Sequence, residues 1–202
     1  EKETLTSRLI DRPIRPLFPD WFQCETMIQI MVMSYDRLCD SDILAINGTS
    51  AALHISDIPW AGPIAAVRVG RIDEEIIINP TVDQQVDSDV NCVMVGTADA
   101  LVMVEAGSFE VSEDVYMDAF EKGHEVIKEL CEAQEELRAE CGKPKREVEE
   151  EAVNEAVMSR VREIATPLLN KAAETHEKMA QYQAIGGAKA ACLEALCTGE
   201  EG

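Results

Sequence analysis

The sequence predicts an α+β fold, with a mixed sheet and packed helices followed by an all-helical region. Two observations lead to this prediction. Paired runs of Ile, Val and Met, separated by short turn segments, occupy residues 65–107. From residue 112 onward the apolar spacing changes to the period of amphipathic helices. Strands with helices followed by helices alone are typical of an α+β core with a helical domain attached.

Composition narrows the class of protein. The 202 residues include 18 Lys and Arg against 39 Asp and Glu, a net charge of −21. Such a charge disfavours a general nucleic-acid surface, because phosphates are neutralised by Lys and Arg, but it leaves room for a local basic site. No apolar run approaches the roughly 18 residues that span a bilayer, so we expect no membrane partner. The seven cysteines lack zinc-ligand spacing and predict a reduced, cytoplasmic protein with mostly buried thiols.

The first elements follow from apolar spacing and from proline. Residues 4–12 predict a helix with Leu5, Leu9 and Ile10 on one side, which Pro13 and Pro16 should stop or kink. Residues 26–35 are dense in Ile, Val and Met, so they predict a strand buried on both faces or nearly so.

Further along the chain, a helix and two strand pairs are expected. Asp40 or Ser41 can cap a helix that ends near Asp57, before Pro59. The runs at 65–72 and 75–80 flank Asp73-Glu74 and predict a hairpin, and residues 90–107 repeat the pattern around a turn at 96–99.

The remainder is expected to be helical. A partial capping box at Ser112 begins a long amphipathic helix that ends at Gly142. Residues 143–147 read as a polar hinge. The Ala- and Glu-rich sequence beyond them should be divided into shorter helices at Pro167 and at Gly186-Gly187.

Most motifs of catalytic or metal-binding sites are absent. The sequence has no phosphate-binding loop, dinucleotide-binding turn or H-E-x-x-H pair. His54, His124 and His176 are scattered and read as structural or surface residues. Two acidic groups could bind a divalent metal, but neither has calcium-loop spacing, and both are interpreted as solvated surface. They are Asp40, Asp42, Asp83, Asp87 and Asp89, and Glu147, Glu149, Glu150 and Glu151.

One basic cluster stands out near the start of the chain. Arg8, Arg12 and Arg15 are three of the seven Lys and Arg in residues 1–110 and fall within eight positions. On a helix they would lie at i, i+4 and i+7, so their guanidinium groups could converge on a phosphate-sized anion. The alternative is that they pair with surrounding carboxylates, and Asp11 between them could orient one guanidinium. Spacing alone leaves both interpretations open.

Longer motifs carry a family resemblance. They read TLTSRLIDRPIRPLFP, SDILAINGTSAALHISDIPWAGPIAAVRVGRID, INPT, VMVGTADALVMVEAG and EKGHEVIKEL. In this order they resemble the first RNase PH-like core, a ribosomal protein S5 domain 2-like fold, of the polynucleotide phosphorylase family. The resemblance implies that residues 1–145 form an N-terminally truncated first core. Residues 146–202 then begin the helical domain that links the two cores.

The resemblance also implies an activity. Members of this family use inorganic phosphate to degrade single-stranded RNA from its 3′ end to nucleoside diphosphates, can polymerise RNA in reverse, and act in mRNA turnover. Mg²⁺ assists, three subunits form a homotrimeric ring, and RNA-degradation machinery is an expected partner. The resemblance places Arg8, Arg12 and Arg15 at the RNA or phosphate site. Catalytic and metal-binding residues are expected on the second core, so none is assigned here, and the chain alone is expected to be inactive.

Two other functions remain as alternatives. The same fold could serve as a non-catalytic RNA-binding or ring-forming subunit, in which the arginines only hold the RNA backbone. An acidic helical adaptor acting through residues 146–202 is a third interpretation, but it ignores the ordered motifs of residues 1–110.

Overall fold

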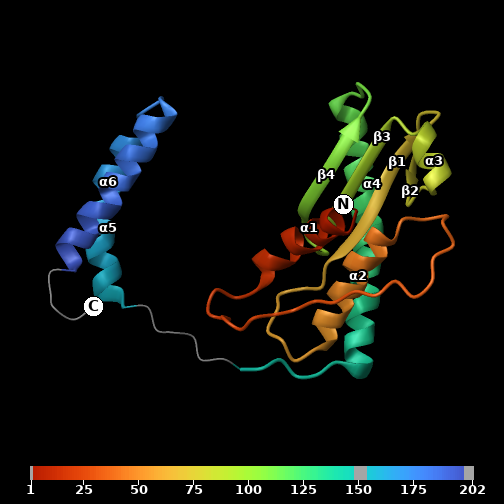
Figure 1. The fold of residues 1–202 in the computed structure, drawn as a ribbon, viewed down its shortest axis with the longest axis horizontal. Coiled ribbons are helices and arrows are strands. Elements are labelled where there is room, and N and C mark those ends of the chain that lie inside the picture. The colour runs from red at the N-terminus through yellow and green to blue at the C-terminus, as the bar shows by residue number, and fades with distance from the viewer. Residues whose placement is uncertain (1, 148–153, 198–202) are drawn as a thin grey trace. The chain divides into compact units, whose positions relative to one another are not determined.

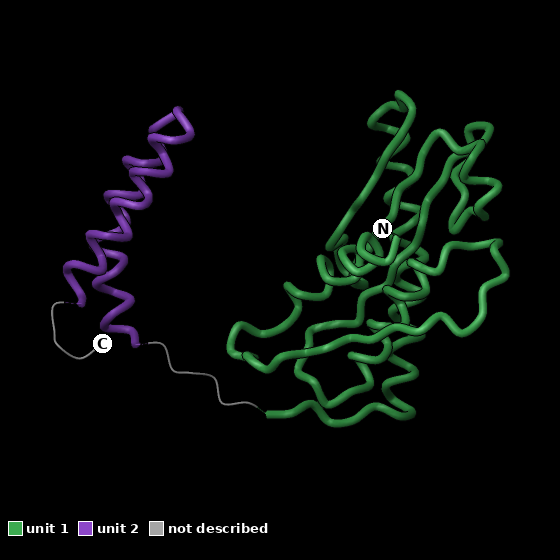
Figure 2. Tube along the Cα trace, viewed as in Figure 1, with its two compact units in different colours: residues 1–149 green, residues 150–202 purple. Residues whose placement is uncertain are grey.

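The computed structural model describes residues 2–147 and 154–197. The chain divides into two compact units, residues 1–149 and 150–202 (Figure 2). Unit 1 contains a sheet with helices packed on it, and unit 2 is a pair of helices (Figure 1). Among the described residues, no helix combines the length and the apolar character that crossing a bilayer requires.

The sheet of unit 1 has four antiparallel strands in the order β2-β1-β3-β4. Both predicted hairpins are confirmed. Ile72 pairs with Glu75 across a two-residue turn, in which Asp73 and Glu74 have φ of 51° and 67°. These positive angles are typical of a type I′ turn, whose twist matches that of the strands. The strands are β1 (Ala65–Ile72), β2 (Glu75–Ile78), β3 (Val90–Gly96) and β4 (Leu101–Ser108).

Helices cover both faces of this sheet. Side chains alternate along β1, so Ala66 packs in a cluster with helices α1 and α2, whereas Val67 and Val69 pack in a second cluster with α4. This double burial explains why β1 reads as a continuous apolar run. The helices are α1 (Lys2–Ile14), α2 (Ser41–Ile55) and α4 (Glu113–Cys141). The expected bounds of α2 and α4 are confirmed, including the end of α4 before Gly142.

Helix α1 passes the first of the two prolines expected to stop or kink it and ends before the second, Pro16. It continues through Pro13 to Ile14, and a 3-10 turn, η1 (Arg15–Leu17), follows. Pro13 lies in the last turn and is itself buried, so its packing offsets the backbone hydrogen bond that it removes. Leu9 and Ile10 are buried as expected, but Leu5 is 53% exposed.

The strand predicted for residues 26–35 is wrong. This segment is irregular and joins η1 to α2 (Figure 1). Met27 and Met33 are 85% and 84% exposed, so the apolar side chains are not buried either. A strand is stable only when its backbone groups pair with a neighbour, and none of β1 to β4 pairs with this segment.

Capping differs from the sequence prediction at three sites. Asp40 occupies the N-cap of α2 and Ser112 that of α4, but neither side chain makes a capping hydrogen bond. A capping box that was not predicted lies at Thr81 and Gln84, where it begins the short helix α3 (Val82–Asp87).

Unit 2 consists of α5 (Glu155–Ala173) and α6 (Lys178–Leu196). The expected breaks are wrong, because α5 continues through Pro167 and α6 continues through Gly186-Gly187. The chain turns instead at residues 174–177, and the Glu177 carboxylate accepts hydrogen bonds from the first amides of α6. These bonds lower the pKa of Glu177.

The expectation of mostly buried thiols is also wrong. Only Cys92 and Cys131 are buried, and desolvation raises the pKa of each thiol to about 11. Cys192 is half-buried, and the other four cysteines are exposed: Cys24, Cys39, Cys141 and Cys197. All seven thiols are free.

Candidate nucleic-acid interface

Helix α1 is amphipathic, and its orientation positions the predicted arginines. Leu9, Ile10 and Ile14 are buried in the cluster that also holds α2 and strands of the sheet. Because one side of the helix is fixed in this core, the other side faces solvent. Arg8, Arg12 and Arg15 all lie on that exposed side, with Arg15 in the 3-10 turn η1.

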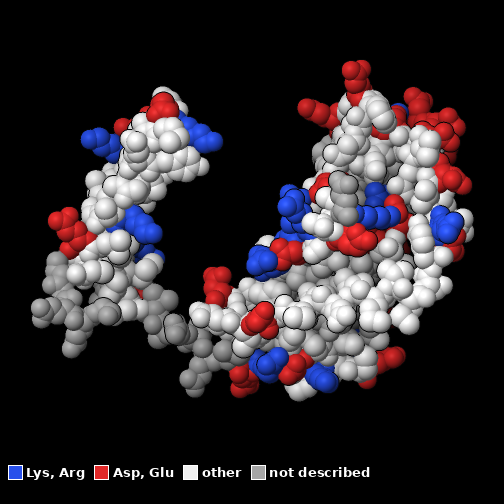
Figure 3. Space-filling view, in the orientation of Figure 1, with Lys and Arg blue, Asp and Glu red and all other residues white. Residues whose placement is uncertain are grey.

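Two of the three arginines contact carboxylates. Arg12 Nη1 donates to Glu105 Oε2 on β4 at 2.8 Å. Arg15 donates to both carboxylate oxygens of Asp11, at 2.6 and 3.1 Å, and this bond raises the pKa of Arg15. Among the described residues, Arg8 has no ion-pair partner. Figure 3 shows basic side chains beside acidic ones over the α1 side of unit 1.

These ion pairs do not prevent binding of an anion. The side chains of Arg12 and Glu105 are 59% and 54% exposed. Pairs at such exposure contribute about 0–1 kcal/mol, because water screens them. Phosphate oxygens accept hydrogen bonds from a guanidinium group as carboxylate oxygens do. The exposed face of α1 can therefore exchange its carboxylate partners for phosphate.

A cavity of about 920 Å³ lies beside α1, and the sequence prediction missed its aromatic wall. Arg15, Phe18 and Phe22 are among its lining residues. The two Phe rings stack with centroids 5.8 Å apart and planes 14° from parallel. Aromatic side chains are the groups on which unpaired nucleobases stack, and here they line the same cavity as Arg15. The four-residue spacing of Phe18 and Phe22 was the available signal.

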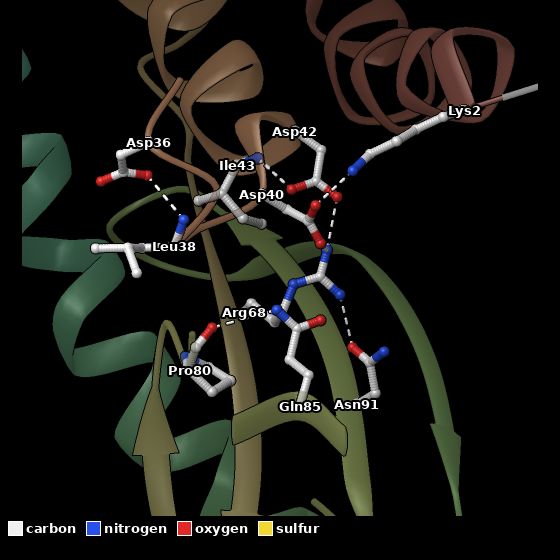
Figure 4. A network of polar contacts seen from close by, with 10 residues as sticks. All are labelled: Lys2, Asp36, Leu38, Asp40, Asp42, Ile43, Arg68, Pro80, Gln85 and Asn91. Carbon is white, nitrogen blue, oxygen red and sulfur yellow. Dashed lines mark hydrogen bonds and ion pairs between the residues drawn. The ribbon is translucent and has the colours of Figure 1, made fainter. Parts of the chain in front are cut away.

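A polar network centred on the buried Arg68 reaches the N-terminal end of α1 (Figure 4). Arg68 on β1 is 8% exposed, and it donates to Asp42 Oδ2 and to Asn91 Oδ1, each at 2.6 Å. Asp40 lies 4.0 Å from the same guanidinium and accepts a hydrogen bond from Lys2, which raises the pKa of Lys2. The network links α1, α2, β1 and β3.

The network corrects the interpretation of the first acidic group as solvated surface. Asp42 is buried, Asp40 is half-buried, and both face Arg68. A buried carboxylate requires such a partner, because its desolvation is otherwise costly. Asp89 pairs with Arg71 at 2.8 Å. Asp83, Asp87 and Glu147 are exposed, whereas Glu149, Glu150 and Glu151 lie outside the described residues.

The described residues contain no cluster of candidate metal ligands. No three or more His, Cys, Asp or Glu side chains gather within residues 2–147 and 154–197 as a metal site requires. The histidines lie apart: His54 is buried, His124 contacts the carbonyl oxygen of Thr97 at 3.0 Å, and His176 is exposed.

Comparison with known families decides the affiliation. The sequence profile of the 3′ exoribonuclease family, domain 1, matches residues 1–59, and that of domain 2 matches residues 62–126. The chain belongs to the 3′ exoribonuclease family. The predicted RNase PH-like α+β core is thereby confirmed. The domain 1 match contains α1 and α2, and the domain 2 match contains the sheet and the first half of α4.

Several relatives of this exoribonuclease-family chain have curated names. It is 50% identical over 193 residues to the polyribonucleotide nucleotidyltransferase of Bacillus subtilis. The aligned residues cover 96% of the chain and 27% of that protein. The enzyme of the same name from Desulfatibacillum aliphaticivorans is 46% identical over 201 residues, 100% of the chain and 28% of that protein. The chain thus spans little more than a quarter of the curated relatives it matches.

A solved structure is also similar to part of this family member. The crystal structure of rice Rrp46 aligns with a TM-score of 0.45 and 17% identity, over 50% of this chain and 48% of that one.

Proposed function

We propose that this chain is part of a phosphate-dependent 3′-to-5′ exoribonuclease, which degrades single-stranded RNA to nucleoside diphosphates and can polymerise RNA in reverse. Membership of the 3′ exoribonuclease family and the names of the relatives support this proposal. The proposal includes a role in mRNA turnover in the cytoplasm, a homotrimeric ring and contacts with RNA-degradation machinery. Inorganic phosphate is the co-substrate.

The observation that carries the proposal is the shared exposed face of Arg8, Arg12 and Arg15. Their helical spacing places them within about 10 Å along the axis of α1, a length that suits several consecutive contacts. Guanidinium groups so placed would hold the RNA backbone or the attacking phosphate. They would also stabilise the negative charge that develops at the reacting phosphorus.

Mg²⁺ is part of the proposal for the whole protein only. The described residues of this chain offer no cluster of metal ligands, so no reaction step is assigned to a metal bound here. We propose that the chain contributes RNA or phosphate contacts, and that it is inactive as an isolated chain.

The test is phosphate-dependent degradation of 5′-labelled single-stranded RNA by the full-length protein. Arg8→Ala and Arg12→Ala should each lower kcat/KM by about 10-fold or more, because each removes a charge-assisted contact to phosphate. Arg162→Ala on α5 is the matched control, since Arg162 is also an exposed helical arginine and lies in unit 2. Its activity should equal that of the wild type.

Other outcomes are equally informative. Unchanged activity in both α1 variants would mean that Arg8 and Arg12 do not contact RNA or phosphate. Binding of RNA without any release of nucleoside diphosphates would favour a non-catalytic ring-forming subunit.

A further inference from the structure

Arg8, Arg12 and Arg15 on the exposed side of α1 and η1 form what we call the arginine face. Glu105 lies at this face without an evident structural purpose. It is on β4, an edge strand of the sheet, 93 residues after Arg12 in the sequence. Packing of α1 against the sheet brings its carboxylate to 2.8 Å from the Arg12 guanidinium. The pair is more than half exposed, so it adds little to the stability of a helix already held by Leu9, Ile10 and Ile14.

The charges around the three arginines indicate an electrostatic effect of the Glu105 carboxylate. The three arginines are accompanied by two carboxylates, Glu105 and Asp11, which engage Arg12 and Arg15. Of these three arginines, only Arg8 has no ion-pair partner among the described residues. A phosphate that takes the Arg12 Nη1 hydrogen bond must displace Glu105, and any phosphate at Arg12 also meets the negative charge of that carboxylate.

We propose that Glu105 is a competing counter-ion that restrains Arg12 and sets the affinity of this face for RNA. This inference rests on the proposed function, and it adds a specificity residue to that site. Because the carboxylate offsets the gain from a single phosphate, the face favours a chain of phosphates that engages Arg8, Arg12 and Arg15 together. Glu105 is a positioning residue, since it acts through Arg12 and not on the RNA.

The proposal has a distinctive dependence on salt. In the wild type, Glu105 competes for Arg12, so the contact between Arg12 and a phosphate forms in only a fraction of the RNA complexes. In Glu105→Gln, Arg12 is free to neutralise a phosphate, which releases a cation from the RNA. The slope of log K against log salt should therefore steepen by at most about 0.7, the value for one phosphate of a single strand.

The experiment measures binding of a fluorescently labelled oligo(A) to the 202-residue chain by anisotropy at several salt concentrations. Glu105→Gln should tighten Kd by about 3- to 10-fold and steepen the salt slope. Glu75→Gln is the matched control, because Glu75 is an exposed glutamate on β2, the strand at the opposite edge of the sheet. The control should bind like the wild type. Thermal melts check that each variant folds.

Two further variants separate failure of this inference from failure of the proposed function. If Arg12→Ala binds RNA as tightly as the wild type, the arginine face is not an RNA site, and the proposed site fails with the inference. If Arg12→Ala weakens binding but Glu105→Gln does not tighten it, the proposed site stands and the inference is overturned. Tightening by Glu105→Gln in the Arg12→Ala background, or by Glu75→Gln, would also overturn it, because the effect would then be one of net charge.

Discussion

The hydroxyl of Ser50 on α2 donates a 2.7 Å hydrogen bond to Oε1 of Gln134 on α4. The same Ser50 oxygen accepts from the amide of Ile64 at 3.0 Å, and Gln134 Nε2 donates to the carbonyl oxygen of Ile64 at 2.9 Å. The three residues close a buried cycle in which these polar groups satisfy one another. The cycle joins both helices to the residue that precedes β1.

Loss of the Gln134 amide should destabilise unit 1. In Gln134→Ala, the Ser50 hydroxyl and the Ile64 carbonyl lose their buried partner, so the free energy of unfolding should fall by about 2–3 kcal/mol. Urea denaturation followed by circular dichroism measures the change. Glu136→Ala, at an exposed position of the same helix, should change stability by less than about 0.5 kcal/mol. Equal effects of the two variants would contradict the importance of the cycle.

Arg68 should be the charged residue to which unit 1 is most sensitive. Arg68→Met leaves Asp42 buried without its cation, which should cost about 3–5 kcal/mol in urea unfolding. The double variant Arg68→Met with Asp42→Leu removes both charges and should recover most of that loss. Failure of the double variant to recover stability would show that the network supports α1 by more than this ion pair.

Burial of His54 should make stability depend on pH. The His54 side chain is fully buried, and this desolvation lowers its pKa. The positive charges of Arg138 and Lys145 lower the pKa further, whereas Glu135 raises it. The unfolded chain therefore binds a proton more readily than the folded one, so stability falls as pH drops below about 6.5.

The contribution of His54 can be isolated with one variant. Between about pH 7 and 5, His54→Gln should lose stability less steeply than the wild type, by at most about 1.4 kcal/mol per pH unit. His176→Gln is the control, because His176 is exposed, and its pH profile should match that of the wild type. Parallel profiles for all three proteins would rule out His54 as the source.

The β1–β2 turn should be open to stabilisation. Glu74 has φ of 67°, a left-handed conformation that glycine adopts without the cost imposed by a Cβ atom. Glu74→Gly should raise the free energy of unfolding by about 0.5–1 kcal/mol and Tm by about 2–4 °C. Glu74→Ala keeps the Cβ atom and should give no such gain. A gain from alanine would mean that the glutamate charge, not the backbone, is unfavourable.

Elements with local determinants could be predicted from the sequence. The two hairpins, α2 and α4 are specified by alternating or helical apolar spacing and by turn residues such as Asp73-Glu74 and Gly142. The arginine cluster was equally visible, because Arg8, Arg12 and Arg15 lie within one short segment.

The ends of helices and the formation of strands were harder to predict, because both depend on contacts with other parts of the chain. Residues 26–35 have strand composition, but a strand also needs a neighbour for its backbone groups, and composition does not supply one. Pro167 and Gly186-Gly187 reduce helix propensity without ending α5 or α6, since a local cost of this kind can be offset by the rest of the helix.

The sequence by itself determined the fold class, the hairpins and the cluster of three arginines, because each depends on residues close together in the chain. Only the tertiary structure decided the partners of those residues. Arg12 meets Glu105 across 93 positions, and Arg68 meets Asp42 across 26. Such contacts depend on how α1 and α2 pack against the sheet, and one-dimensional spacing carries no information about that packing.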